Sequence, residues 1–159
     1  MVNSSKPVSF GEPEGVSEGD WFPDHAALYA NGLHRQPGRG ISGSADKGTD
    51  SIVLSGGYAD DVDEGDVILY TGEGKQKDNE LVEDQSWASP GNAGLVLTAA
   101  LGKPVRVIRG LGIRGGRRRR VTGGYRYCGL YRVAAYWTDV GTVGLKICQF
   151  EMQIGRAHV

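Results

Sequence analysis

Two tyrosines, a run of carboxylates and a pair of glycines meet in residues 52–72, IVLSGGYADDVDEGDVILYTG. An apolar run ends at the glycine pair, Tyr58 and Asp61 follow it, and a second apolar run ends at Tyr70. Aromatic rings stack on flat ligands, a carboxylate accepts from an amino group, and glycine lets a ligand approach the backbone because it has no Cβ. The pattern predicts a site that binds a flat, polar, uncharged ring.

The elements that position this site are predicted to be mainly strands. Glycine supplies 26 of the 159 residues, or 16%, whereas its usual share is roughly 7%. Because these glycines follow no G-X-Y period, their number favours a turn-rich β fold. Strands are expected at 51–55, 66–71, 105–109, 130–137 and 143–152, and helices at 25–31 and 92–101. The expected fold class is mainly β with short helices, in one domain that forms a barrel or a strongly curved sheet.

Particular residues set the expected ends and faces of these elements. Asp24 is a suitable N-cap for the first helix, and Gly32 and Gly102 are suitable stop signals for the two helices. Residues Val105–Arg109 alternate apolar and basic side chains, which predicts a strand with one solvent-facing side.

Composition excludes several classes of protein. No apolar run reaches 18 residues, so no membrane span is predicted, and the first ten residues lack the apolar core of an export signal. Cys128 and Cys148 do not have a metal-binding spacing. Both lie in apolar segments, where buried free thiols are common. We therefore expect a reduced intracellular protein without a metal or other cofactor.

Charge is divided unevenly along the chain. Residues 1–105 hold 7 basic and 17 acidic side chains, a net charge of −10, whereas residues 106–159 hold 11 and 2, a net charge of +9. The positive part centres on Arg114 and on the run Arg117, Arg118, Arg119 and Arg120. Such polarity indicates a polyanionic partner, and nucleic acid is the commonest one.

The motif around Tyr58 resembles the signature of the SET- and RING-associated (SRA, or YDG) domain, a reader of 5-methylcytosine in DNA. Further blocks resemble this family in the same order along the chain. They are GLHR at 32–35, GI at 40–41, SIVLSGGYADDVDEGD at 51–66, YTG at 70–72, DQ at 84–85, GKPVRVIRG at 102–110 and YCGLYRVAAY at 127–136.

The resemblance implies a PUA-like curved β-barrel over residues 11–152, between a flexible N-terminus, 1–10, and a C-terminal tail, 153–159. It also implies that one nucleotide rotates out of double-stranded methylated DNA into a pocket, where stacking and edge hydrogen bonds must offset the cost of extrusion. The compact loops and the absence of fused domains favour a bacterial member in the cytoplasm, associated with the nucleoid; a eukaryotic member would be nuclear.

Within this family, Tyr58 and Tyr70 would sandwich the flipped base, and each stacked face contributes roughly 1–3 kcal/mol. Asp61 would accept from the cytosine N4 amino group and reject thymine, which presents O4 there. The alternative for the tyrosines is that they are ordinary core aromatics. The alternative for Asp61 is that it belongs to a solvated acidic turn, which suits Asp63 and Glu64 better.

Backbone groups of Ser55, Gly56 and Gly57 would face the O2 and N3 edge of the pyrimidine, or form a β-bulge that only bends the strand. Thr71 is the last expected pocket residue, through a hydrogen bond to the pocket or to the extruded nucleotide. One buried methyl group contributes about 0.8 kcal/mol, so preference for methylated over plain cytosine is expected to be measurable but not absolute.

Two loops would enter the duplex in this family. In the first, residues 34–40, Gly38 occupies the position of the inserting residue but has no side chain, so Arg35, Gln36 or Arg39 is expected to substitute. In the second, residues 74–84, there is no arginine. Lys75 and Lys77 are its expected DNA contacts. The absence of an arginine predicts that DNA binding depends only weakly on sequence context.

The arginine loop is predicted to clamp phosphates, with a solvated charge run as the alternative. Its members are Arg114, Arg117, Arg118, Arg119 and Arg120. Each phosphate neutralised steepens the log–log salt dependence of binding by about 0.9.

Three functions remain from this pattern. The first is a non-enzymatic reader of modified cytosine, because His25, His34 and His158 are too few for an HNH metal site and no catalytic triad is evident. The second is the recognition part of a modification-dependent restriction endonuclease. The third, an RNA-binding PUA-like module, conflicts with the complete GGYADD signature.

Overall fold

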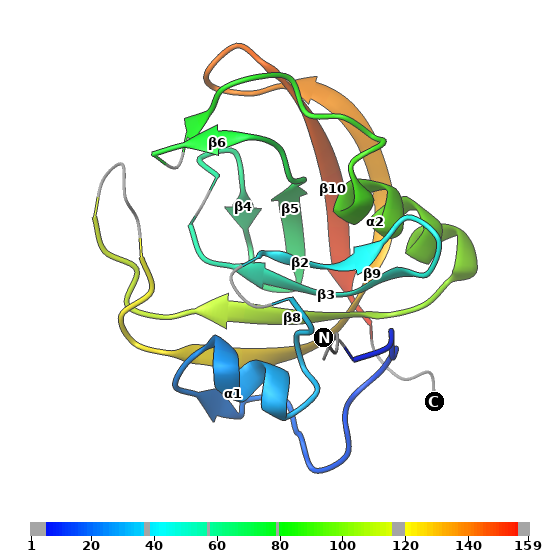
Figure 1. Ribbon diagram of the computed structural model, residues 1–159, viewed down its shortest axis with the longest axis vertical. Coiled ribbons are helices and arrows are strands. Elements are labelled where there is room, and N and C mark those ends of the chain that lie inside the picture. Colours follow the sequence, from blue (N-terminus) through cyan, green and yellow to red (C-terminus); the bar gives the residue numbers. More distant parts are fainter. Residues whose placement is uncertain (1–5, 37–38, 57, 79, 116–119, 156–159) are drawn as a thin grey trace, which may run out of the picture.

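A strongly bent β-sheet is the main element of the computed structural model, which describes residues 6–36, 39–56, 58–78, 80–115 and 120–155 (Figure 1). The strands are β1 (Trp21–Phe22), β2 (Ile41–Ser44), β3 (Gly48–Leu54), β4 (Val62–Asp63), β5 (Val67–Thr71), β6 (Gln76–Lys77), β7 (Glu80–Leu81), β8 (Val105–Gly110), β9 (Tyr125–Val140) and β10 (Lys146–Ile154). The helices are α1 (His25–Ala30) and α2 (Pro90–Leu101). The main expected strands and both helices are thus confirmed, with shifted ends.

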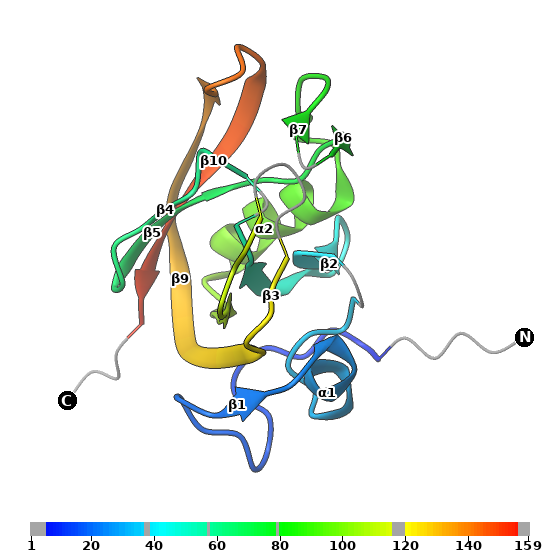
Figure 2. The same cartoon turned by 90° about the vertical axis from the view of Figure 1, so that its left-hand side faces the viewer.

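The main sheet runs in the order β2-β3-β8-β9-β10-β5-β4, with β1 added to β9, while β6 and β7 form a separate hairpin. Only β3 and β8 pair in parallel among these strands of the described chain. β9 pairs with β8 along its first half and with β10 along its second, and Figure 2 shows it turning sharply between the two. This bend gives the predicted curvature, but the path from β2 to β4 stays open, so the described sheet is not a closed barrel.

The helix signals in the sequence are confirmed. Asp24 Oδ1 accepts from the backbone amide of Ala27 at 2.9 Å, which caps α1. α2 begins with a proline in its first turn and ends at Gly102, whose φ of +66° is a conformation that glycine adopts without strain. α2 is fixed to β3 because the Thr98 hydroxyl bonds both backbone groups of Thr49 at 2.8 Å.

Both faces of β3 are buried. Ile52 belongs to a core cluster with Leu95 of α2 and Phe150 of β10, whereas its neighbour Val53 belongs to a second cluster beside α1. Successive side chains of a strand point to opposite faces, so one strand anchors both clusters. The segment that follows β3 therefore starts from a strand whose seven residues are all buried.

The expectation that β8 has a solvent-facing side is wrong. Arg106 is 1% exposed; its Nε donates to the carbonyl of Leu33 at 2.8 Å. Its guanidinium lies 3.4 Å from Asp50 of the paired strand β3. Asp50 also accepts from Arg35 Nε at 2.7 Å. A buried cation is tolerated here because a carboxylate and backbone carbonyls surround it.

Short elements occur in regions where loops were expected. β2 lies in the segment after Leu33, and β6 and β7 lie within residues 74–84. Near the N-terminus, Lys6 Nζ donates to the carbonyl of Tyr29 at 2.6 Å, and the Ser9 amide donates to Asp50 at 3.0 Å. In the part of the chain that the structure describes, neither helix has the length and apolar character to cross a membrane.

Candidate functional site

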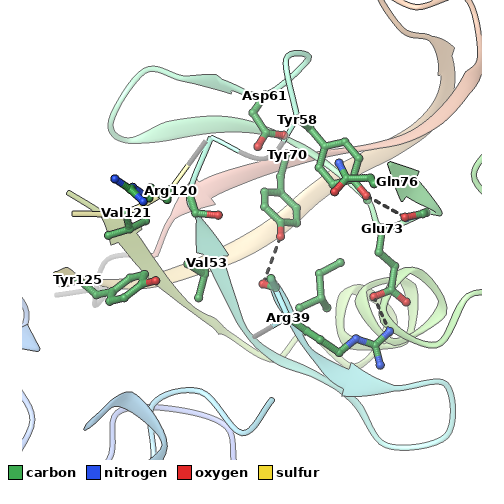
Figure 3. Close-up of a pocket in the computed structure, with 15 residues that line it drawn as sticks. Arg39, Val53, Tyr58, Asp61, Tyr70, Glu73, Gln76, Arg120, Val121 and Tyr125 are labelled. Carbon is green, nitrogen blue, oxygen red and sulfur yellow. Dashed lines mark hydrogen bonds and ion pairs between the residues drawn. The ribbon is translucent and has the colours of Figure 1, made fainter. Parts of the chain in front are cut away.

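A cavity of about 560 Å³ opens beyond the end of β3, between β5 and the segments that follow β5 and β8 (Figure 3). Four residues predicted for the pocket line it: Ser55, Tyr58, Asp61 and Tyr70. The other lining residues are Arg39, Gly40, Ile41, Val53, Gly72, Glu73, Gly74, Gln76, Arg120, Val121 and Tyr125. The structure therefore brings the two tyrosines and the aspartate to one cavity.

Both tyrosine rings are oriented by bonds from their hydroxyls to backbone. The Tyr58 hydroxyl accepts from the Gly74 amide at 3.0 Å and donates to the Gly74 carbonyl at 3.3 Å. The Tyr70 hydroxyl donates to the Gly40 carbonyl at 3.3 Å. Burial raises the pKa of both phenols, so they stay neutral and act as donors. Tyr70 is 4% exposed and also packs in the core, which unites the pocket and core interpretations of this residue.

Asp61 is held at the cavity from behind. Its Oδ1 accepts from the Thr71 backbone amide at 2.7 Å, and the Thr71 hydroxyl accepts from Gln149 Nε2 at 2.9 Å. Burial raises the pKa of Asp61 to about 6, against the opposing effect of its hydrogen bonds from Thr71. A carboxylate with lone pairs left for a ligand thus faces the cavity from a partly desolvated position.

The neighbouring acidic residues are used elsewhere. Asp60 accepts from the Thr142 amide at 3.0 Å. Asp63 forms two bonds with Arg109, at 2.6 and 2.7 Å, which lower the pKa of that carboxyl group. Asp63 is therefore an ion-pair partner rather than a free solvated acid. Of Asp60, Asp61 and Asp63, it is Asp61 that lines the cavity.

Two other predicted pocket residues, Thr71 and Gly56, are not among the described residues that line the cavity. Thr71 is fully buried, and its backbone amide bonds the pocket residue Asp61 from behind. Gly56 lies next to Ser55 with a φ of +74° and is not among the lining residues. Gly57 lies outside the described residues.

The first predicted loop contributes one side chain to the mouth. Arg39 lines the cavity and lies 3.4 Å from Glu73, with 59% of its side chain exposed. Arg35 is instead held in its ion pair with Asp50, with 11% of its side chain exposed, so it supports the loop. Gln36 is partly exposed, and Gly38 lies outside the described residues.

The arginine loop begins as two antiparallel segments, residues 111–115 and 120–124, which we call the arm. The backbone groups of Arg114 and Arg120 exchange two hydrogen bonds of 3.0 Å, and Arg120 lines the cavity. At the base of the arm, next to β8 and β9, the Leu111 amide donates to the Gly124 carbonyl at 2.9 Å. Arg117, Arg118 and Arg119 lie outside the described residues.

The second predicted loop carries the β6–β7 hairpin. Lys75 and Lys77 are exposed, and Gln76 between them lines the cavity. Asp78 at the turn has a φ of +54°, as the tight turn of a two-residue hairpin requires. The cavity is therefore framed by three chain segments: residues 39–40, the hairpin and the arm.

Sequence reasoning missed two lining residues, Glu73 and Tyr125, which lie on opposite sides of the cavity in Figure 3. Glu73 comes directly after the YTG motif, so its place at the end of β5 was a usable signal. Its Oε2 accepts from the Gly91 amide at 2.9 Å, at the start of α2. Tyr125 has no local signal, because β9 brings it back to the cavity from the far end of the arm. Among the described residues, no three His, Cys, Asp or Glu side chains gather closely enough to hold a metal ion.

Comparison with known proteins agrees with this geometry. The UHRF1-like protein of Cryptococcus neoformans is 37% identical over 94% of this chain and 47% of its own length. The modification-dependent TagI restriction endonuclease matches with a TM-score of 0.84 and 42% identity, over 93% of this chain and 53% of that one. The SUVH5 SRA domain in complex with fully methylated CG DNA matches with a TM-score of 0.78 and 33% identity, over 96% and 97%.

The chain thus spans about half the length of the UHRF1-like and TagI proteins. The family described as the SAD/SRA domain matches residues 9–156. Nearly the whole chain, including every wall of the cavity, lies within that match, and the chain belongs to the SAD/SRA domain family.

Proposed function

We propose that this domain binds double-stranded DNA containing 5-methylcytosine and flips the modified base into the cavity. The observation that carries the proposal is the convergence of Tyr58, Asp61 and Tyr70 on one cavity. The fold similarity to the SUVH5 SRA domain, solved with methylated DNA, supports it. The domain works on DNA, which lies in the nucleoid of a bacterium or the nucleus of a eukaryote.

Each wall of the cavity has a part in holding the base. The ring stacks on Tyr58 and Tyr70, and two stacked faces at roughly 1–3 kcal/mol each offset the cost of extrusion. Asp61 accepts from the N4 amino group, so thymine is rejected because its O4 would face the carboxylate. Backbone groups of Ser55, Gly56 and Gly57 face O2 and N3 of the base. The Thr71 backbone amide keeps Asp61 in place.

The segments around the mouth hold the distorted duplex. Arg39, Lys75 and Lys77 contact phosphates or bases, and the arm clamps phosphates through Arg114 and Arg120, with Arg117 to Arg119 between them in the chain. The hairpin offers two lysines and no arginine, which supports weak dependence on flanking sequence. Binding that follows CpG context closely would contradict this part of the proposal.

The direct test is a titration of matched duplexes that carry one cytosine or one 5-methylcytosine. We expect several-fold tighter binding to the methylated duplex, and loss of that preference in Asp61→Ala. A fluorescent base analogue beside the target site reports extrusion independently. Equal affinity for the two duplexes together with no extrusion signal would overturn the proposal.

A second function is the recognition part of a modification-dependent restriction endonuclease. The 42% identity to the TagI restriction endonuclease over about half of that protein favours it. In this view the domain itself binds without cutting, and a separate nuclease part supplies the chemistry. Incubating methylated DNA with the chain in magnesium or manganese tests the division of labour, because cleavage by this chain alone would contradict it.

A further inference from the structure

The DQ block at residues 84–85 has no part in the proposed function, although its glutamine is buried close to the cavity. Gln85 is 8% exposed and is not among the lining residues. Its Oε1 accepts from the Cys148 amide at 2.9 Å, and its Nε2 donates to the Gly72 carbonyl at 2.6 Å. Cys148 belongs to β10, which is paired on both sides in the sheet. One buried amide thus ties the segment after β5 to an interior strand.

This segment, residues 72–74, connects the two rings that are proposed to hold the base. Tyr70 comes shortly before it in the chain, on β5. Gly74 at its far end bonds the Tyr58 hydroxyl through both backbone groups, at 3.0 and 3.3 Å. Tyr58 itself comes from the segment after β3, so these bonds fix its ring relative to Tyr70. The separation of the two rings therefore depends on where residues 72–74 lie.

Two buried side-chain amides hold the backbone of residues 72–74. Asn92, in the first turn of α2, accepts from the Glu73 amide at 2.8 Å and donates to the Glu73 carbonyl at 3.0 Å. Gln85 packs directly against Gly74, because a Cβ added there would fall 2.8 Å from Gln85 Cγ. Buried polar groups that are bonded in this way specify one arrangement of the chain.

Gln85 also acts on the phenol of Tyr58. Burial raises the pKa of Tyr58, and hydrogen bonding from the Gly74 backbone and from the Gln85 side chain opposes the rise. Gln85 therefore influences the hydroxyl directly as well as through residues 72–74. Both routes end at the Tyr58 hydroxyl, which orients the ring.

Stacking on both faces of a base tolerates little error in ring position. Each face makes its best contact at about 3.5 Å, so the two ring planes must stand roughly 7 Å apart. A gap of about 0.5–1 Å on one face already forfeits roughly a quarter to a half of the attraction. A side chain that never touches the base can therefore decide how well the base is held.

We propose that Gln85 is a positioning residue, which holds the Tyr58 ring at the distance from Tyr70 that a flipped base requires. It acts through residues 72–74 and the Tyr58 hydroxyl. This inference rests on the proposed function and adds a residue behind the cavity wall to it.

The test uses Gln85→Met, which keeps the length of the side chain but removes both hydrogen bonds. We expect it to lose the several-fold preference for the methylated over the plain duplex, together with the extrusion signal of a fluorescent base analogue. The log–log salt slope should stay that of the parent, because the arm is unchanged. Gln153→Met is the matched control on β10, since Gln153 bonds Arg132 and Glu151 and does not line the cavity. Circular dichroism fixes a temperature at which every variant is folded.

A double-mutant cycle with Tyr58→Phe separates positioning from a general structural role. Tyr58→Phe keeps the aromatic ring but removes the hydroxyl that Gly74 bonds, so it should show the same losses as Gln85→Met. In the Tyr58→Phe background, Gln85→Met should cause no further loss, because its route to the ring is already cut. A loss of the same factor in both backgrounds would mean that Gln85 does not act through Tyr58, and would overturn the inference.

The possible failures are distinguishable. A folded Gln85→Met that keeps the preference and the extrusion signal overturns the inference and leaves the proposed function intact. Tyr58→Phe with the full preference and signal of the parent does the same, even if Gln85→Met does not fold. A parent protein that binds both duplexes equally and gives no extrusion signal instead overturns the proposed function, and this inference with it.

Discussion

The backbone amide of Thr71 donates to Asp61 Oδ1 at 2.7 Å, and this bond holds a partly desolvated carboxylate at the wall of the cavity. Burial is the largest influence on Asp61 and raises its pKa to about 6, although the bonds from Thr71 oppose the shift. The site is thus built around a charge that the folded protein disfavours. Two pH-dependent consequences follow from the raised pKa of Asp61.

Replacing Asp61 with asparagine is expected to stabilise the free protein at neutral pH. A carboxyl group whose folded pKa is raised contributes stability below its unfolded pKa, near 3.8, and loses it as the pH rises through about 6. Asp61→Asn should therefore raise the free energy of unfolding by roughly 1–3 kcal/mol at pH 7.5 and change it little at pH 4. Thermal or urea unfolding at both pH values measures this.

The contrasting variant is Asp63→Asn. The bonds from Arg109 lower the pKa of Asp63, so its contribution is present at neutral pH and lost as the pH falls. Asp63→Asn should destabilise the protein at pH 7.5, the opposite sign to Asp61→Asn. An equal gain from Asp61→Asn at both pH values would mean that packing, rather than ionisation, causes it.

Binding of modified DNA is expected to weaken as the pH falls through 6. The N4 amino group needs an ionised acceptor, so binding below pH 6 requires Asp61 to release a proton, and affinity drops by at most about tenfold per pH unit. Fluorescence anisotropy from pH 5 to 8 at constant ionic strength measures the profile. Asp61→Asn should bind weakly with a flat profile, which separates Asp61 from His25, whose pKa burial lowers from 6.5. A flat profile in the unmodified protein would contradict the role of Asp61.

Local signals were sufficient for much of the fold and for part of the pocket. The Asp24 cap and the Gly102 stop place the helices correctly, because capping depends on residues within one turn. Tyr58, Asp61 and Tyr70 were singled out because they follow a glycine pair or end an apolar run, and Ser55 was added through the family resemblance. The family resemblance then supplied the chemistry that these residue types alone left open.

Long-range contacts explain the differences. Arg106 was expected on a solvent-facing side because a basic residue in an alternating strand has the same local pattern whether it is solvated or paired. Its partner Asp50 lies on another strand, and the parallel pairing of β3 with β8 brings them together. Tyr125 reaches the cavity only because β9 returns from the arm. No window of sequence contains either relationship.

The buried ion pairs of Asp50 predict a large loss of stability when they are broken. Asp50→Asn leaves the Arg106 guanidinium, which is 1% exposed, without its counter-charge. Removing one partner of a buried pair costs roughly 3–5 kcal/mol. Urea unfolding measures the change, and the exposed control Asp46→Asn should stay within about 0.5 kcal/mol of the parent. A loss no larger than that of the control would show that the buried cation is hydrated in solution.

The base of the arm is held by a close contact with Trp21. Trp21 Nε1 donates to the Gly123 carbonyl at 2.9 Å, and a Cβ added to Gly124 would fall 2.5 Å from that nitrogen. Gly124→Ala should therefore displace the arm and weaken binding of modified and plain DNA several-fold alike. Gly144→Ala is the matched control, because Gly144 also has a positive φ, +85°, but no atom within 4 Å of an added Cβ. Equal binding by the two variants would mean that arm position does not matter.

Arg120 is the described residue of the arm best placed to report on phosphate contacts, since it lines the cavity and its side chain is exposed. Arg120→Ala should weaken plain and methylated duplexes by the same factor and reduce the log–log salt slope of binding by about 0.9 for one lost phosphate contact. Affinities measured at several salt concentrations give the slope, and Arg132→Ala, an exposed arginine of β9 outside the cavity wall, serves as the control. If Arg120→Ala instead weakens only the methylated duplex and leaves the salt slope unchanged, Arg120 contacts the flipped base rather than the backbone.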